Sequence, residues 1–114
     1  MQSRRPPIET VALRLAVLLK RTEKTRARVS EKTLRILSGR TSLRDSFVVS
    51  VRNALEDFGV VSFRLDRGGF ALIATSALEG APPALVKNLM PDFKNLSDDK
   101  LWNELDLRDD EVDE

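Results

Sequence analysis

Positively charged side chains are concentrated in one stretch of the sequence, residues 20–44. This stretch carries nine Lys and Arg side chains, and its only acidic residues are Glu23 and Glu31. Guanidinium and ammonium groups form charge-assisted hydrogen bonds with phosphate oxygens, so a dense cationic stretch indicates a phosphate-rich polyanion as its partner. The chemistry that these residues favour is therefore the binding of phosphates.

The net charge changes sign along the chain. Residues 1–70 carry 15 Lys and Arg and 7 Asp and Glu side chains, a net charge of +8, whereas residues 71–114 carry 4 and 11, a net charge of −7. Such asymmetry is typical of a polyanion-binding body with an acidic tail. We expect residues 107–114 to be a flexible tail, because they contain too few apolar side chains to form a core. At low salt this tail would weaken non-specific binding to the basic face.

The residue types that most often perform catalysis or hold metals are absent. The sequence contains no Cys, no His and no Tyr, and its carboxylates, lysines and hydroxyls show no spacing that pairs a nucleophile with a base. The acidic tail lacks the glycine of a calcium loop, and Gly68-Gly69 lacks the pattern of a phosphate-binding loop. We therefore expect no enzyme activity, and we assign no catalytic residue, metal ligand or cofactor.

The length of the chain suits one domain, because stable single cores usually need roughly 50–200 residues. We assign residues 1–106 to that domain. No stretch approaches the ~20 apolar residues that cross a membrane, and the first residues lack the long apolar region of a secretory signal. We expect a cytoplasmic protein, nucleoid-associated if it binds DNA.

Helical spacing of apolar residues predicts three helices in the first half of the chain. The first covers residues 7–22, the second begins after Ser30 and ends at Gly39, and the third covers residues 42–58, with Ser42 as its cap and Asp45 in a capping box. A short strand at residues 27–29 is expected between the first two helices.

The apolar period changes from 3.6 to 2 after residue 59. Val61, Phe63 and Leu65 alternate with polar residues, residues 66–69 form a turn, and Phe70, Leu72 and Ala74 alternate again. This pattern predicts a β-hairpin. Two further helices are expected, one over residues 83–90 and one that begins after Ser97 and carries Leu101, Trp102 and Leu105.

This order of elements resembles the winged helix-turn-helix family of DNA-binding domains. The resemblance covers residues 8–76 and depends on the turn at residues 38–41, the helix at residues 42–58 and the hairpin tip at residues 66–69. It implies an α+β fold of three helices plus a β-hairpin wing, here extended by two C-terminal helices. It also implies that the third helix enters the major groove while the wing contacts the flanking DNA backbone.

The expected DNA contacts combine the exposed face of the third helix with basic residues from several elements. Arg52 has the donor geometry to bind guanine, Asn53 to bind adenine, and Val49 suits a thymine methyl group. The alternative interpretation is a solvated face on which Arg52 pairs with Glu56. The full set of expected contacts is Arg26, Arg28, Lys32, Arg35, Arg40, Ser42, Arg44, Ser46, Val49, Arg52, Asn53, Arg64 and Arg67.

Three functional interpretations remain open on the sequence. The leading one is a transcriptional regulator that represses by occupying its site on double-stranded DNA. The others are a winged-helix subunit that binds proteins in a larger complex, and an antitoxin-like regulator whose acidic C-terminus binds a basic partner. Leu13 and Val17 widen the apolar surface of the first helix, and Trp102 adds an aromatic patch. These side chains either pack in the core or form a homodimer through the first helix and the C-terminal helices.

Overall fold

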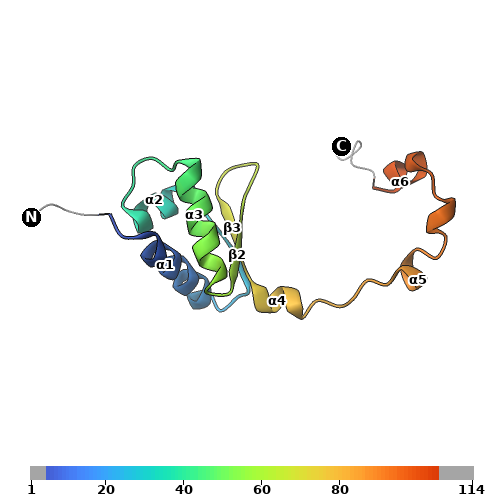
Figure 1. The fold of residues 1–114 in the computed structure, drawn as a ribbon, viewed down its shortest axis with the longest axis horizontal. Coiled ribbons are helices and arrows are strands. Elements are labelled where there is room, and N and C mark those ends of the chain that lie inside the picture. The colour runs from blue at the N-terminus through green and yellow to red at the C-terminus, as the bar shows by residue number, and fades with distance from the viewer. Residues whose placement is uncertain (1–4, 106–114) are drawn as a thin grey trace, which may run out of the picture. The chain divides into compact units, whose positions relative to one another are not determined.

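The computed structural model describes residues 5–105 and has an α+β fold. The chain divides into two structural units, residues 1–81 and residues 82–114. The first unit contains α1 (Ile8–Arg21), β1 (Arg26–Val29), α2 (Glu31–Ser38), α3 (Asp45–Glu56), β2 (Val60–Arg64), β3 (Phe70–Ala74) and α4 (Thr75–Glu79) (Figure 1). The second unit contains α5 (Val86–Leu89), a 3-10 turn (Phe93–Asn95) and α6 (Asp98–Leu105).

The sheet has three antiparallel strands in the order β1-β3-β2. β2 and β3 form the expected hairpin, in which Val60 pairs with Ala74 and Arg64 pairs with Phe70. β1 pairs with the other edge of β3 and confirms the short strand that the sequence suggested. Gly69 has a φ of +83°, and a Cβ there would lie 2.7 Å from the carbonyl oxygen of Val29. The hairpin can therefore approach β1 only because this residue has no side chain.

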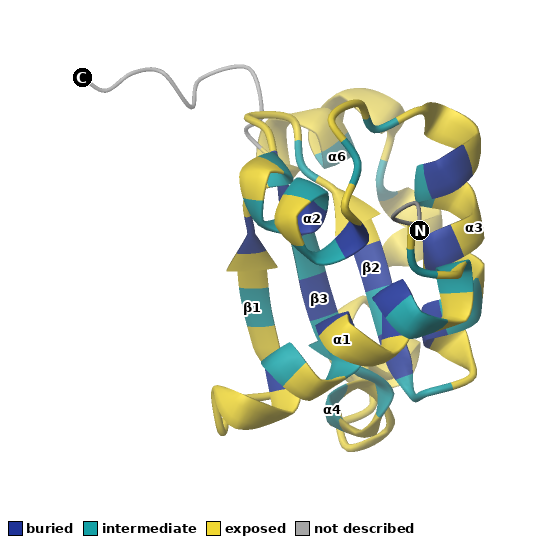
Figure 2. Cartoon of the chain, turned by 90° about the vertical axis from the view of Figure 1, so that its left-hand side faces the viewer, coloured by how far each residue is buried: buried dark blue, intermediate teal, exposed yellow. Residues whose placement is uncertain are grey.

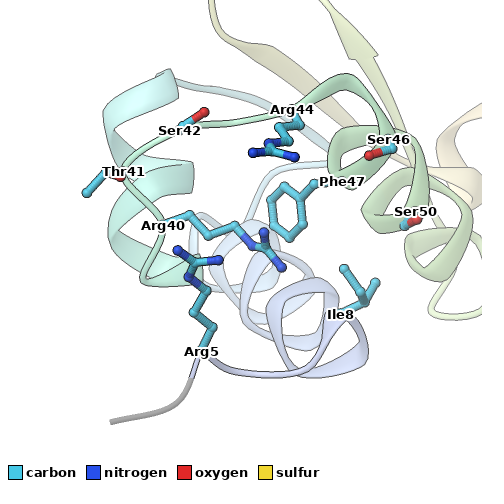
Figure 3. A pocket seen from close by; sticks show the side chains of 9 residues that line it. All are labelled: Arg5, Ile8, Arg40, Thr41, Ser42, Arg44, Ser46, Phe47 and Ser50. Atoms are coloured by element: carbon cyan, nitrogen blue, oxygen red, sulfur yellow. The ribbon is translucent and has the colours of Figure 1, made fainter. Parts of the chain in front are cut away.

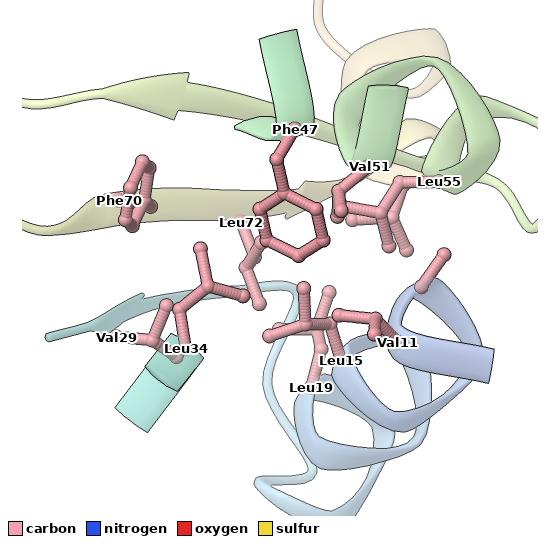
Figure 4. Packing of buried hydrophobic residues seen from close by; sticks show 12 residues of the cluster. Val11, Leu15, Leu19, Val29, Leu34, Phe47, Val51, Leu55, Phe70 and Leu72 are labelled. Carbon is pink, nitrogen blue, oxygen red and sulfur yellow. The ribbon is translucent and has the colours of Figure 1, made fainter. Parts of the chain in front are cut away.

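The core of the first unit lies between the sheet and helices α1, α2 and α3 (Figure 2). Arg14 on α1 donates a hydrogen bond of 2.6 Å to the carbonyl oxygen of Leu37, which ties α1 to the end of α2. Leu13 and Val17 are 44% and 43% exposed, so the structure places both outside this core. The buried apolar side chains are Val11, Ala12, Leu15, Leu19, Val29, Leu34, Phe47, Val51, Leu55, Val60, Phe70 and Leu72 (Figure 4).

The second helix begins and ends as the sequence predicts. The Ser30 hydroxyl accepts a hydrogen bond of 3.0 Å from the backbone N–H of Thr33, and Gly39 ends the helix in the left-handed conformation with a φ of +68°. A glycine is favoured there because an L side chain strains this backbone conformation.

The third helix begins later than expected. Its first residue is Asp45, its N-cap is Arg44 in an extended conformation, and no side chain caps it, so the prediction that Ser42 is the cap was wrong. Residues 39–44 form the connection to α2, and Leu43 within it packs against the core. Asp45 pairs with Arg64 instead of closing a capping box.

The buried face of β2 is not the one that carries its alternating apolar residues. Ser62 is buried at 8% exposure, whereas Phe63 is 50% exposed. The alternation of Val61, Phe63 and Leu65 thus predicted the hairpin but does not identify its inward face. Val60 is buried and pairs with Ala74, and this register directs Val60 and Ser62 into the core.

The second unit contains no buried residue between residues 82 and 105. The helix expected over residues 83–90 is reduced to the four residues of α5, and α4 was not foreseen. α6 begins after Ser97 as predicted, and the Ser97 hydroxyl accepts a hydrogen bond of 3.3 Å from the N–H of Lys100. The assignment of residues 1–106 to one domain stays a prediction, and the expected tail at residues 107–114 lies outside the described residues. Among residues 5–105, no helix is both long and apolar enough to span a membrane.

Candidate nucleic-acid interface

A cationic hollow of about 570 Å³ lies at the start of α3. We call it the α3 hollow. Its basic members come from three places in the sequence: Arg5 precedes α1, Arg40 follows α2, and Arg44 precedes α3. No Asp or Glu is among its lining residues, which are Arg5, Ile8, Arg40, Thr41, Ser42, Arg44, Ser46, Phe47 and Ser50 (Figure 3).

Local structure explains how the three arginines reach one place. Gly39 turns the chain at the end of α2, and the backbone N–H of Arg40 donates a hydrogen bond of 3.2 Å to the carbonyl oxygen of Arg35. Pro6 lies against this turn, because its Cδ is 3.5 Å from the position of a Cβ on Gly39. The contact between Pro6 and Gly39 therefore brings Arg5 next to Arg40, which is 35 positions later in the sequence.

Arg40 is fixed within the hollow by an aromatic ring. Its guanidinium carbon lies 4.0 Å from the centroid of the Phe47 ring, a distance typical of a cation–π contact. Its Nε is buried and has no hydrogen-bond partner within residues 5–105. Figure 3 shows the guanidinium groups of Arg40 and Arg44 beside the Phe47 ring and that of Arg5 next to Arg40. The hollow thus concentrates positive charge beside an aromatic ring, while the Nε of Arg40 itself is closed to solvent.

The exposed face of α3 continues from this hollow. Phe47, Val51 and Leu55 are buried, and the opposite face of the helix is exposed to solvent. The residues expected to contact bases or the nearby backbone from this helix are all exposed: Ser46, Val49, Arg52 and Asn53. Their polar groups are consequently available to a groove of DNA, although contact with bases stays a prediction.

A second hollow of about 500 Å³ lies where the hairpin tip meets β1. We call it the hairpin hollow. It contains Arg28 and Arg67, and also the carboxylate of Glu31. Because Glu31 offsets part of the positive charge, the hairpin hollow is less cationic than the α3 hollow. The structure therefore places Arg40 and Arg44 in one site and Arg28 and Arg67 in another.

The remaining expected residues lie elsewhere on the first unit. The guanidinium of Arg64 lies 3.0 Å from the carboxylate of Asp45 and 5.3 Å from the ring of Phe70, so an ion pair already engages it. Lys32 is exposed on α2 and Arg35 is half-buried there. Arg26 pairs with Ile73 in the strand register, next to the inward pair of Ala27 and Leu72. This register places Arg26 on the face of the sheet that points away from the core.

The sequence did not identify every residue of the α3 hollow. Arg5, Thr41 and Ser50 line it, and none of them was assigned to the expected DNA-contacting set. Thr41 and Ser50 could have been suggested by the sequence, because each lies within four residues of a residue in the expected DNA-contacting set. No sequence pattern pointed to Arg5, since its place in the hollow depends on the contact between Pro6 and Gly39.

Neither a protein-family model, nor a curated protein, nor a solved structure matches this chain. Within residues 5–105, no group of three His, Cys, Asp or Glu side chains is placed to hold a metal ion. Functional inference therefore depends on the residues of the two hollows and on the exposed face of α3.

Proposed function

We propose that residues 5–81 form a winged helix-turn-helix domain that binds double-stranded DNA and represses transcription by occupying its site. In this proposal α3 enters the major groove, the α3 hollow binds a backbone phosphate, and the β2-β3 hairpin acts as the wing. The observation that carries the proposal is the α3 hollow, which brings three arginines and no carboxylate together beside the exposed face of α3. A cytoplasmic, nucleoid-associated location belongs to the same proposal.

The order of the elements supports the proposal. α1, β1, α2, α3, β2 and β3 follow one another as the wing architecture requires, with β3 between β1 and β2. The connection between α2 and α3 spans residues 39–44, which is longer than the turn at residues 38–41 expected from the sequence. The exposed half of α3 remains free of packing by other elements of the first unit, as insertion into a groove requires.

Binding of a random duplex by the full chain, measured by fluorescence anisotropy between about 50 and 200 mM salt, tests the proposal. Six phosphate contacts predict a slope of about −5 in the logarithm of affinity against the logarithm of salt, from about −0.9 per contact. Replacing Arg40 and Arg44 together with Ala is expected to make the slope shallower by about 0.9 for each lost contact. Replacing Arg21 and Arg26 together with Ala is the matched control, because it also removes two positive charges and neither residue lines the α3 hollow.

Base recognition requires a separate measurement. After selection of a preferred site from a random library, Arg52→Ala and Asn53→Ala are expected to reduce discrimination against mismatched sites by about 1–3 kcal/mol each. Binding to random duplex should persist in both variants. If the wild type and both variants showed the same site preference, this face of α3 would not contact bases and would only be exposed to solvent.

A homodimer is part of the proposal, because one small domain reads about one half-site. The exposure of Leu13 and Val17 on α1 supports this part. Sedimentation velocity is expected to give a dimer for the intact chain and a monomer for a chain that ends at residue 96. A monomer in both cases would remove the dimer from the proposal.

A second candidate function is binding of a basic protein partner through the C-terminal unit. It is favoured by the exposure of Trp102 at 50%, Leu105 at 63% and Leu89 at 69% in an acidic part of the chain. Exposed apolar groups in such numbers are typical of interaction segments. Absence of DNA binding at about 50 mM salt would favour this candidate, either as a subunit of a complex or as an antitoxin-like regulator.

A further inference from the structure

The α3 hollow is larger than a single backbone phosphate requires. Its volume of about 570 Å³ falls within the roughly 300–1,000 Å³ that is typical of sites for small molecules. Ile8 and Phe47 supply its apolar lining, and charged or hydroxyl side chains supply the rest. The size and lining are therefore those of a site for a small, highly charged ligand.

Among residues 5–105, no Asp or Glu lines the hollow. Arg5, Arg40 and Arg44 share the site, and the carboxylate of Asp45, which follows Arg44 in the sequence, lies 3.0 Å from Arg64 instead. Like charges gathered at one place repel one another, and an anion with several negative charges relieves this repulsion more than one with a single charge. The hollow therefore favours a polyanion.

Arg40 is prepared for such a ligand before the ligand arrives. Its guanidinium is held 4.0 Å from the Phe47 ring, and its buried Nε has no partner within residues 5–105. Fixing the guanidinium on a ring reduces the entropy that binding would otherwise cost. The hydroxyl groups of Ser42 and Ser46 line the same site and add donors for phosphate oxygens.

We propose that the α3 hollow binds a small polyphosphate, an anion of the pyrophosphate or triphosphate class, and that this ligand competes with DNA. The competition rests on the proposed function, because DNA would place a backbone phosphate in the same hollow. Binding of the polyphosphate does not rest on it. A rise in the concentration of such an anion would release the domain from DNA.

Isothermal titration of the full chain with inorganic pyrophosphate and with inorganic triphosphate tests the site directly, at constant ionic strength set by chloride. One site per chain is expected, with tighter binding of the more highly charged triphosphate. Arg40→Ala and Arg44→Ala should each weaken binding at least 10-fold. Arg21→Ala is the matched control and should leave binding unchanged, because Arg21 does not line the hollow.

The variants are informative even if one of them unfolds. Arg40→Ala removes the contact with Phe47, so circular dichroism must establish that it folds. Arg44 is exposed, and its replacement should not disturb the core. Wild-type binding that survives unchanged in Arg44→Ala, or that requires several equivalent sites per chain, would show adsorption to a basic surface and would overturn the proposal.

Competition with DNA separates this proposal from the proposed function. Triphosphate at ten times its dissociation constant is expected to raise the apparent dissociation constant for duplex DNA about 11-fold in the wild type, as simple competition for one site requires. The same concentration of triphosphate should change the apparent dissociation constant for DNA little in Arg44→Ala. DNA binding that triphosphate does not alter would overturn the competition alone. Triphosphate binding without any DNA binding would preserve the site and overturn the proposed function.

Discussion

Residues 5–81 and residues 82–105 both carry apolar side chains at helical spacing, but they expose them to very different extents. Twelve apolar side chains are buried in the first region, whereas no residue is buried in the second. The first region packs α1, α2 and α3 against a sheet, so the apolar residues of the core cluster meet one another. α5 and α6 have four and eight residues, and helices that short are marginal without tertiary packing. An amphipathic pattern thus predicts a helix, but burial requires a complementary surface.

The largest expected effect compares one leucine from each region. Leu55→Ala should lower the free energy of unfolding by about 2–5 kcal/mol, because Leu55 is fully buried and its truncation leaves a cavity. Leu105→Ala should change it by less than about 0.5 kcal/mol, because Leu105 is 63% exposed. Urea unfolding followed by circular dichroism measures both. Equal effects would mean that Leu105 is buried in solution, which would contradict the difference in burial between the two regions.

The next effect concerns two neighbouring glycines within the first region. Gly68 and Gly69 both have positive φ, but only a Cβ on Gly69 would collide with the backbone of Val29, since nothing lies within 4 Å of one on Gly68. Gly68→Ala should cost about 1–2 kcal/mol from its backbone conformation. Gly69→Ala should cost about 1 kcal/mol more, because the hairpin must move away from β1. Denaturant midpoints of the two variants give the difference. Equal midpoints would show that the hairpin can move away from β1 without loss of stability.

A smaller effect is expected for the ion pair on the surface of the first region. The side chain of Asp45 is 91% exposed and that of Arg64 is 43% exposed, so water and salt screen their attraction. A double-mutant cycle with Asp45→Asn and Arg64→Gln should give a coupling energy below about 1 kcal/mol. The coupling should decrease as salt is added. A larger, salt-independent coupling would place this pair among the interactions that determine the fold.

The smallest effect is expected when the second region is removed. A chain that ends at residue 81 should have a free energy of unfolding within about 0.5 kcal/mol of that of the full chain, because none of residues 82–105 is buried. Thermal and urea unfolding of the two chains provide the measurement. A marked loss of stability in the shorter chain would mean that the second region packs against a surface in solution.

Local signals were sufficient to predict several elements. Ser30 and Gly39 identified the two ends of α2, and the glycines at the hairpin tip identified the turn between β2 and β3. These residues act through their own backbone conformation or through a neighbour three residues away. The start of α3 was misplaced because Leu43, which packs against the core, outweighs the preference of Ser42 for a cap.

The candidate site was predictable in part. The sequence assigned Arg40, Ser42, Arg44 and Ser46 to the expected DNA-contacting set, and these residues line the α3 hollow. It grouped Arg64 with them, although that side chain is paired with Asp45. The difference arises because charge counts identify which residues are cationic, while the position of each partner in space determines which charges remain available.

The sequence by itself determined the order of the helices and strands from α1 to β3, since caps, glycine turns and apolar periods act over a few residues. Only the tertiary structure decided which face of β2 points inward, because apolar side chains at Val60 and Val61 made both alternating sets acceptable. It also decided that Arg5 joins Arg40 and Arg44. That meeting depends on Pro6 packing against Gly39, a contact between residues far apart in the chain that no local pattern encodes.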